Sequence, residues 1–219
     1  MATGAVAGFL PSVQGFQFDN DWPPGPARVL RLGPLRLPIG DTGRGLCGGM
    51  IFVARDRFHR GQPMPLDPKP PKPETALFDE IVDRQFASFG TFFSVPLRFY
   101  LAAIPLRSQV ARDRETVQEA WPAIKAAIDR GDPAMVGLIL KVTWDPLAPL
   151  GHQVVAWRYD ESATGIRLGV YDPNYHGHDD IELSIDRLAD GSYAIAHSDN
   201  RKLFGLLALP YERPRADLG

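Results

Sequence analysis

Cys47, His152 and Asp172 have the residue types of a nucleophile, a base and a group that orients a base. Cys47 stands in the segment Gly45-Leu46-Cys47-Gly48-Gly49-Met50 and begins an apolar run that fits a helix. A cysteine in the first turn of a helix lies at the positive end of the helix dipole, which favours the nucleophilic thiolate. The small neighbours leave room for a substrate carbonyl, and the Cys47 N–H is a candidate donor to an oxyanion. This segment therefore predicts attack on a carbonyl through an acyl-enzyme.

A catalytic thiolate needs a base or a cationic partner, and His152 begins an apolar strand in Gly151-His152-Gln153-Val154-Val155. Asp172 closes the next apolar run, in Val170-Tyr171-Asp172-Pro173-Asn174. If the two runs form a hairpin, its ends lie side by side, so Asp172 can accept a hydrogen bond from the imidazole and fix its tautomer. Asn174, through its side-chain oxygen, is an alternative orienting group.

The elements that must position these groups follow from hydrophobic periodicity. The spacing predicts helices over residues 47–59 and 74–89 and a third within 113–130, with Asp113 as its N-cap and a kink or restart at Pro122. Apolar runs between turn residues predict strands over 135–142, 153–159, 166–171, 181–185, 193–196 and 203–209. Helices in the first half and an antiparallel run in the second describe an α+β fold.

Two segments predict little regular structure. Residues 1–45 are punctuated by Pro and Gly and are expected to form an irregular lead-in that wraps over the domain, with short extended pieces such as Val29–Leu32. Residues 63–73 contain six prolines, which predicts an extended, proline-rich connection. The aromatic-rich stretch 92–100 indicates core packing or a wall of a substrate groove. The length of 219 residues fits a single domain over residues 1–219.

Composition limits the other classes of function. The formal net charge is −2 at pH 7 without a basic run, so we expect no nucleic-acid partner. One cysteine cannot form an internal disulfide, and nothing points to an oxidising compartment. The sequence has neither a signal-peptide pattern nor an apolar stretch of about 18 residues. We therefore expect no membrane span and a cytoplasmic location, although export without a cleavable signal would leave the same sequence.

The segment His176-Gly177-His178-Asp179-Asp180 has side chains that can bind a metal. No further ligand stands at a diagnostic spacing, so we interpret the segment as a solvated loop. We expect neither a metal site nor a cofactor. The sequence does not indicate an oligomeric state.

Three local contexts carry a family resemblance: Cys-Gly-Gly-Met at 47–50, His-Gln-Val at 152–154 and Tyr-Asp-Pro-Asn at 171–174. Together they resemble the papain-like cysteine peptidases, and most closely the bacterial branch that includes the double-glycine leader peptidases of bacteriocin exporters. In that branch the third triad member lies in an Asp-Pro pair, as Asp172 does here. The chain also resembles a group of uncharacterised bacterial proteins with the same three motifs, from Phe16 to Tyr211.

The resemblance implies a single papain-like α+β domain. Its N-terminal helical part, which carries the cysteine helix, would pack on a C-terminal antiparallel sheet. The implied activity is that of a cysteine peptidase with a Cys47-His152-Asp172 triad, acting on a protein or peptide substrate. Amidase, deubiquitinase-like and acyltransferase chemistry would use the same residues.

One position departs from the papain-like pattern. These enzymes usually place an oxyanion-hole glutamine shortly before the cysteine, where this chain has Asp41, and an ionised aspartate cannot donate. Asn20 is a candidate replacement, as are Gln14 and Gln17. The departure favours a second hypothesis, a catalytically inactive binding module on the same fold. A third is a toxin or effector protease domain with the same triad.

Overall fold

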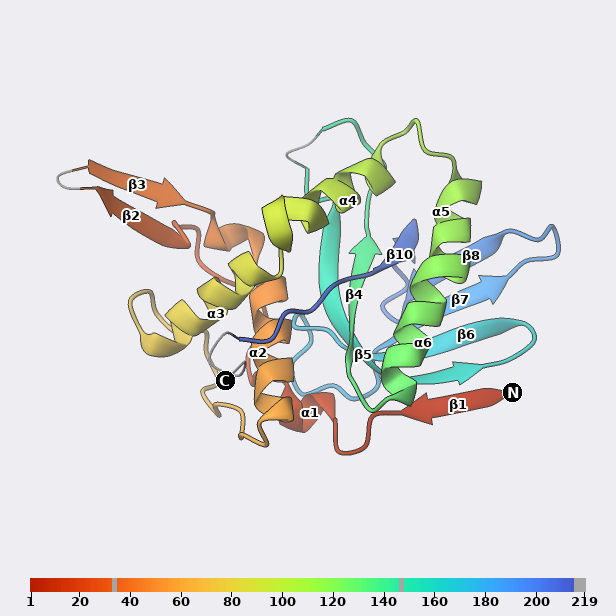
Figure 1. Ribbon diagram of the computed structural model, residues 1–219, viewed down its shortest axis with the longest axis horizontal. Coiled ribbons are helices and arrows are strands. Elements are labelled where there is room, and N and C mark those ends of the chain that lie inside the picture. Colours follow the sequence, from red (N-terminus) through yellow and green to blue (C-terminus); the bar gives the residue numbers. More distant parts are fainter. Residues whose placement is uncertain (33–34, 146–147, 215–219) are drawn as a thin grey trace.

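The computed structural model describes residues 1–32, 35–145 and 148–214, and of residues 30–32 and 35–37 it describes the backbone alone (Figure 1). Its helices are α1 (Pro11–Gln14), α2 (Cys47–His59), α3 (Ala76–Ala87), α4 (Ser94–Ala103), α5 (Gln109–Glu115) and α6 (Trp121–Asp129). Its strands are β1 (Ala2–Ala5), β2 (Arg28–Leu32), β3 (Leu35–Ile39), β4 (Ala134–Ile139), β5 (Gly151–Glu161), β6 (Gly165–Tyr171), β7 (Glu182–Arg187), β8 (Tyr193–His197), β9 (Lys202–Leu203) and β10 (Gly205–Ala208). The chain therefore has the mixed α+β fold that the sequence predicts.

The large sheet is antiparallel and has the order β10-β4-β5-β6-β7-β8-β9, with β1 paired to the outer half of β5. Phe204 alone separates β9 from β10, so one short run of chain pairs with β8 at one end of this order and with β4 at the other. The sheet is therefore strongly curved, because this short run of chain connects its two edges. A register shift at Trp157 in β5, a β-bulge, adds to the bend.

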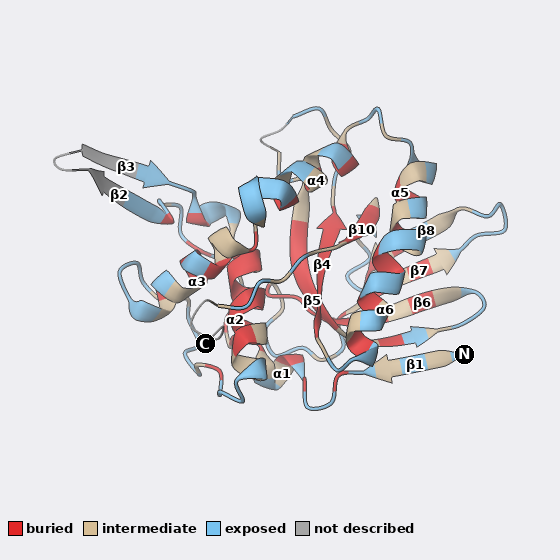
Figure 2. Ribbon diagram, viewed as in Figure 1, coloured by how far each residue is buried: buried red, intermediate tan, exposed pale blue. Residues whose placement is uncertain are grey.

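Helix α2 is the buried centre of the N-terminal half. Every side chain from Gly48 to Ala54 is buried (Figure 2), as expected for a helix that is apolar on nearly all sides. The helix packs against α3 and against β5. A Cβ atom at Gly49 would lie 2.1 Å from the carbonyl oxygen of Ile81 in α3, so this glycine lets the two helices approach to backbone contact.

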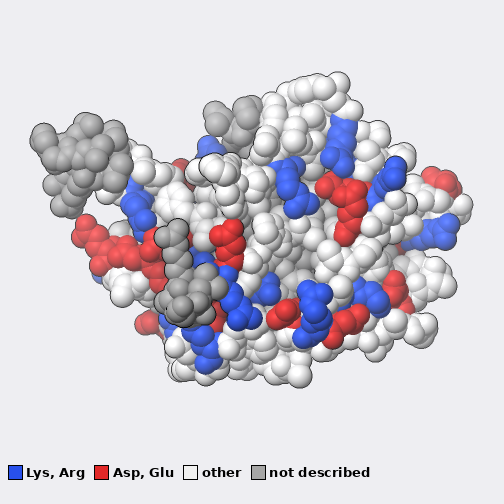
Figure 3. Space-filling model, viewed as in Figure 1, with Lys and Arg blue, Asp and Glu red and all other residues white. Residues whose placement is uncertain are grey.

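The C-terminal sheet is covered by helices of the middle of the chain. Helix α6 packs against β1, β4, β5 and β10, and α5 packs against β10 (Figure 1). One hydrophobic core runs through α2, α3, α6 and the sheet, and also takes up Phe9 and Phe16 from the lead-in. On the face drawn in Figure 3, acidic and basic side chains are interspersed.

The lead-in is more regular than the sequence predicts. Residues 1–45 contain β1, α1 and the β2–β3 hairpin, whereas the proline-rich residues 63–73 form an extended connection without helix or strand. The prolines and glycines of the lead-in separate short elements, and buried side chains such as Phe9 and Phe18 hold those elements on the core. The short extended piece predicted over Val29–Leu32 lies within β2, whereas β1, α1 and β3 were not predicted.

The third predicted helix begins earlier than expected. Ser108 is the N-cap of α5 and accepts a hydrogen bond from the Ala111 N–H at 3.2 Å, whereas Asp113 lies buried inside the helix. A π-helical turn over Thr116–Ala120 separates α5 from α6. That turn stands where Pro122 would otherwise disturb a regular α-helix, which agrees with the predicted restart.

Helix α4 was not predicted, because its sequence is apolar on most sides and contains Pro96. Phe92 and Phe93 precede it with φ values of 54° and 57°, a left-handed conformation that is rare for aromatic residues. At its other end, the buried Arg112 donates to the carbonyls of Ala102 (2.8 Å) and Ile104 (2.9 Å) and so caps the helix. Among the described residues, no helix is both long and apolar enough to cross a membrane.

Candidate active site

Cys47 is the first residue of α2, at the point where the sequence predicts the helix to begin. Gly45, two residues earlier, has φ +84°, and a Cβ atom there would lie 2.5 Å from the side-chain nitrogen of Asn20. The chain can therefore turn sharply into the helix beside Asn20. Cys47 is partly exposed and lines a cavity of about 420 Å³.

Adjacent strands bring His152 and Asp172 together. His152 is the second residue of β5, and Asp172 directly follows β6, which pairs with β5 in antiparallel register. His152 Nε2 lies 2.7 Å from Asp172 Oδ1, and the two side chains are 7% and 1% exposed. His152 also lies close enough to Cys47 for its charge to lower the pKa of the thiol. Because Nε2 faces the carboxylate, Nδ1 is the ring nitrogen left for the thiol.

The charges in this cluster stabilise one another against burial. Burial raises the pKa of Cys47, but interactions with His152, above all its charge, outweigh burial and lower that pKa. Burial lowers the pKa of His152, but the charges of Asp172 and Cys47 raise it to about 10. Burial raises the pKa of Asp172, but the charge of His152 holds it well below its usual range. All three directions favour thiolate, imidazolium and carboxylate at neutral pH.

Asn174 lies beside the triad and supports Asp172. Its backbone N–H donates to Asp172 Oδ1 at 2.8 Å, and its side-chain nitrogen lies 3.4 Å from His152 Nε2. The shorter contact to the imidazole is therefore the one made by Asp172. Of the two orienting groups that the sequence left open, the geometry favours Asp172.

Asn20 joins the loop before Cys47 to the turn after Asp172. Its Oδ1 accepts hydrogen bonds from the Leu46 N–H at 2.6 Å and from Trp22 Nε1 at 3.0 Å. Its Nδ2 donates to Asn174 Oδ1 at 3.2 Å. Because Oδ1 has two donors, the orientation of the amide is defined and Nδ2 retains a second hydrogen.

The other residues considered for the oxyanion hole have different contacts. Asp41 caps the 3-10 turn before Cys47 by accepting from the Gly43 N–H at 3.0 Å. Gln17 Nε2 donates to backbone carbonyls of its own loop, and Gln14 lies in α1. Of these four side chains, Asn20 is the one that forms a hydrogen bond with Leu46, the residue adjacent to Cys47.

The sequence analysis missed His197, the last residue of β8. Its side chain is 1% exposed, and its Nε2 lies 3.3 Å from Asp172 Oδ2. Tyr175 stacks on its ring, with ring centroids 5.4 Å apart. A usable signal was the alternation along β8, because His197 and the buried Ile195 share one face of the strand.

The cavity beside Cys47 has mainly apolar walls. Phe99 of α4 packs against Gly151, where a Cβ atom would lie 2.2 Å from the Phe99 ring. The glycine before His152 therefore leaves the space that the Phe99 ring occupies. Gln85 also lines the cavity, and its Oε1 accepts from the Gly49 N–H at 2.8 Å. The apolar lining residues include Leu46, Phe86, Phe89, Val95, Pro96, Phe99 and Leu150. The predicted groove wall is therefore formed in part by residues 95–100, whereas Phe92 and Phe93 are exposed.

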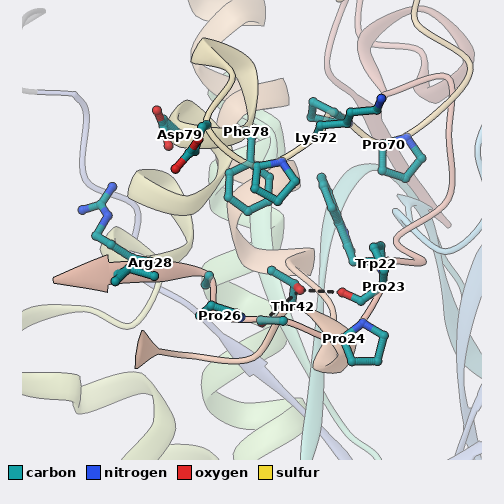
Figure 4. A pocket seen from close by; sticks show the side chains of 16 residues that line it. Trp22, Pro23, Pro24, Pro26, Arg28, Thr42, Pro70, Lys72, Phe78 and Asp79 are labelled. Carbon is teal, nitrogen blue, oxygen red and sulfur yellow. Dashed lines mark hydrogen bonds between the residues drawn. The ribbon is translucent and has the colours of Figure 1, made fainter. Parts of the chain in front are cut away.

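A larger cavity, of about 510 Å³, lies away from Cys47 (Figure 4). Trp22 and Phe78 and the prolines of residues 23–26 and 70–73 line it. The hydroxyl of Thr42, which lines this cavity, donates a hydrogen bond to the carbonyl of Pro23 at 2.7 Å (the dashed line in Figure 4). Its lining contains neither a cysteine nor a histidine, so the smaller cavity is the one that combines a binding surface with nucleophilic chemistry.

The His176–Asp180 segment is tied to the lead-in. His176 Nδ1 lies 2.9 Å from Asp19 Oδ1, and Asp179 Oδ2 accepts from the Ser12 hydroxyl at 2.6 Å. In the part of the chain that the structure describes, no group of three or more His, Cys, Asp or Glu side chains is placed to hold a metal ion.

No family model matches the chain, and neither the curated proteins nor the solved structures contain a significant match.

Proposed function

We propose that this chain is a cysteine hydrolase of papain-like plan, most simply a peptidase. The observation that carries the proposal is the 2.7 Å contact between His152 and Asp172, with the charge of the same imidazole lowering the pKa of Cys47 at the start of α2. A nucleophile, a base and an orienting group in this order have the geometry that nucleophilic catalysis requires. The adjacent cavity offers a place for an acyl chain or a peptide.

The arrangement of elements also supports the papain-like plan. A buried helix carries the nucleophile at its N-terminus, and the facing antiparallel sheet carries the base and the orienting group on neighbouring strands. The start of α2 contributes its dipole to the thiolate, and the sheet contributes rigidity to the imidazole.

In the proposed reaction the Cys47 thiolate attacks the carbonyl carbon, and the carbonyl oxygen becomes an oxyanion. The His152 imidazolium gives its proton to the leaving amine as the C–N bond breaks, which leaves an acyl-enzyme and a neutral imidazole. His152 then takes a proton from water, the hydroxide attacks the acyl carbon, and the thiolate leaves. Asp172 keeps the imidazole oriented and stabilises its charged form throughout.

The oxyanion needs two donors, and the proposal assigns them to the Cys47 N–H and to Asn20 Nδ2. The first lies at the start of α2, where backbone N–H groups lack partners within the helix. The second lies against Gly45 and has a hydrogen beyond the one it gives to Asn174. This assignment replaces the glutamine that the papain-like pattern would place at residue 41.

The same Asp41 supports a second candidate, a catalytically inactive binding module. Asp41 accepts a hydrogen bond in a turn and lines the cavity, where an ionised carboxylate would oppose a developing oxyanion. In a binding module Cys47 would be an ordinary thiol, and the cavity would hold a peptide without cleaving it. The reactivity of Cys47 distinguishes the two candidates.

The test is iodoacetamide alkylation of the native protein across about pH 4 to 9, since an ordinary thiol has a pKa of about 8.5 and reacts slowly below it. We expect fast alkylation at about pH 5 to 6 that is lost in His152→Ala, because the imidazolium no longer stabilises the thiolate. His176→Ala is the matched control, as this exposed histidine pairs with Asp19 away from Cys47. Slow alkylation below about pH 8 that is the same in both variants would favour the binding module.

A further inference from the structure

Asp172 has a second histidine on the side away from His152. Asp172 Oδ1 takes the contacts from His152 (2.7 Å) and from the Asn174 N–H (2.8 Å). Asp172 Oδ2 lies 3.3 Å from His197 Nε2, an ion-pair distance, and neither of these two buried atoms forms a hydrogen bond of regular geometry with any described residue, each other included. Both side chains are 1% exposed, so water does not readily replace the contact.

The surroundings of His197 place a proton on the nitrogen that faces Asp172. The Asp199 backbone N–H donates to His197 Nδ1 at 3.1 Å, so in the neutral ring Nδ1 accepts and Nε2 carries the hydrogen. The ring nitrogen that lies 3.3 Å from Asp172 Oδ2 is therefore the one that carries a hydrogen.

The groups around His197 are themselves held in place. The Tyr175 hydroxyl donates to Asp199 Oδ2 at 2.7 Å, and its ring stacks on the imidazole. The Arg201 N–H donates to Asp199 Oδ1 at 2.8 Å, and the Arg201 guanidinium lies 2.5 Å from Asp199 Oδ2. The charged and titratable groups that face His197 are therefore Asp172, Asp199 and Tyr175, with Arg201 behind Asp199. This fixed ring of partners limits the orientations open to the imidazole.

We propose that His197 is a positioning residue of the active site, which orients and keeps ionised the carboxylate of Asp172, so that the working unit is Cys47, His152, Asp172 and His197. The inference rests on the proposed function. A buried carboxylate can rotate about its Cβ–Cγ bond, and a donor on each oxygen fixes that rotation. Without His197, Oδ2 would be a buried acceptor with no donor, which favours the protonated carboxyl.

The test compares three substitutions of His197 in the full chain. His197→Gln places an amide N–H near the position of Nε2, His197→Asn is shorter and does not reach Asp172, and His197→Leu has no donor. The first readout is the pKa of Asp172, from the NMR shift of its carboxyl carbon. The second is the pH profile of Cys47 alkylation, with His176→Leu as the control histidine. Circular dichroism reports whether each variant is folded.

We expect the acid dissociation constant of Asp172 to fall about tenfold in His197→Leu and His197→Asn, because the ionised form loses the imidazole N–H that lies beside Oδ2. Because the pKa of Asp172 starts well below its usual range, this change leaves Asp172 ionised at about pH 5, so the alkylation rate there should not change and shows that the rest of the site is intact. His197→Gln should stay within about twofold of the wild-type protein, as expected when one donor replaces another. A merely structural role would not separate Gln from Asn.

Unchanged Asp172 titration in folded His197→Asn or His197→Leu would overturn the proposal, and so would equal shifts in His197→Gln and His197→Asn. If His197→Leu does not fold, the comparison of Gln with Asn still decides. The titration is repeated in a Cys47→Ala background, so it does not depend on a reactive thiol. Slow alkylation of the wild-type protein would thus count against the proposed function, while the Asp172 titration alone decides the role of His197.

Discussion

Asp172 acts on Cys47 through the histidine between them. Its side chain is 1% exposed, and an isolated carboxylate at such a position would protonate or require strong partners. The negative charge that remains on Asp172 keeps His152 protonated, and the protonated His152 keeps Cys47 in its thiolate form. In the proposed function, the reactivity of the Cys47 thiol would therefore depend on how well the site stabilises a buried carboxylate.

This dependence predicts how stability changes with pH. In a Cys47→Ala background, His152 keeps Asp172 as a partner, so we expect its folded-state pKa to stay above the unfolded value of about 6.5. A raised folded-state pKa contributes stability that is complete below the unfolded pKa and is lost as the pH rises through the folded one. The free energy of unfolding should therefore fall as the pH rises from about 6.5 through the folded-state pKa of His152.

Urea unfolding at several pH values across that window measures the slope. Cys47→Ala/Asp172→Asn is the comparison, because the neutral amide no longer raises the pKa of His152, and its slope should be much smaller. Equal slopes in the single and the double variant would mean that Asp172 does not hold the His152 proton.

The sequence pointed to Cys47, His152 and Asp172 because each has an informative local context. The glycines around Cys47 mark a helix start, and His152 and Asp172 stand at the matching ends of two strands that form a hairpin. His197 has no such context. It reaches Asp172 because β6, β7 and β8 lie side by side in a curled sheet, and that curvature is not encoded in any short segment.

At the scale of the elements, the contact between α2 and α3 depends on the absence of side chains. A Cβ atom at Gly48 would lie 2.1 Å from the hydroxyl of Ser88, and one at Gly49 would lie 2.1 Å from the carbonyl oxygen of Ile81. A hydroxyl can rotate away, but a backbone carbonyl inside a helix cannot. Gly49 therefore sets the distance between α2, which carries Cys47, and α3.

We expect Gly49→Ala to lower the free energy of unfolding by about 1–2 kcal/mol, because overpacking against the backbone of α3 outweighs the higher helix propensity of alanine. Gly25→Ala is the control, since the nearest atom to a Cβ there is 3.8 Å away and its φ is not positive. Urea unfolding of both variants against the wild-type protein measures the difference. A Gly49→Ala protein as stable as Gly25→Ala would show that the helices can separate without loss.

The spacing of apolar residues predicted the helices and strands that have one clear hydrophobic period, and it did not predict the elements that lack one. The helix over Cys47–His59 lies where the sequence predicts it, and the strands of the C-terminal half lie within a few residues of their predicted ranges, except that the predicted strand over 203–209 is interrupted at Phe204 and forms β9 and β10. β1 has only four residues, and it is a strand because β5 extends beyond β4 and leaves an edge to pair with. Such tertiary pairing overrides local propensity, which is why the lead-in could not be predicted from its composition.

At the scale of the whole molecule, each end of the chain packs on the opposite half of the fold. β1 leaves the N-terminal half and pairs with β5 of the sheet. The chain after β10 leaves the sheet and returns to the helical half, where Tyr211 packs on Phe52 of α2 with ring centroids 5.3 Å apart. Cys47 belongs to one half, and His152 and Asp172 belong to the other. The two crossings therefore help to fix the distance on which the triad depends.

The second crossing ends at a buried ion pair. Asp56 of α2 is 2% exposed, and its Oδ2 lies 2.7 Å from Arg84 Nε of α3. The Tyr211 hydroxyl donates to Asp56 Oδ1 at 2.5 Å, and Arg84 also donates to the carbonyl of Glu212 at 2.6 Å. Burial raises the pKa of Asp56, and Tyr211 and Arg84 only partly offset that effect. The contacts from Tyr211 and Arg84 therefore stabilise the buried carboxylate of Asp56 but do not fully compensate for its burial.

A double-mutant cycle tests this crossing. We expect Arg84→Met to lower the free energy of unfolding at neutral pH by about 3–5 kcal/mol, because it leaves the Asp56 carboxylate buried without its cation. Asp56→Asn/Arg84→Met should recover part of that loss, since the neutral amide has no charge to compensate. The deficit of Arg84→Met should also shrink as the pH falls, because a carboxyl with a raised pKa is protonated early and the unpaired charge disappears. Urea unfolding from about pH 4 to 8 measures both effects. The contrary result has two parts: the losses of the two single variants add up to that of the double variant, and the loss of Arg84→Met does not change with pH. Arg84 would then stabilise the fold through packing and its bond to Glu212 rather than through the charge of Asp56.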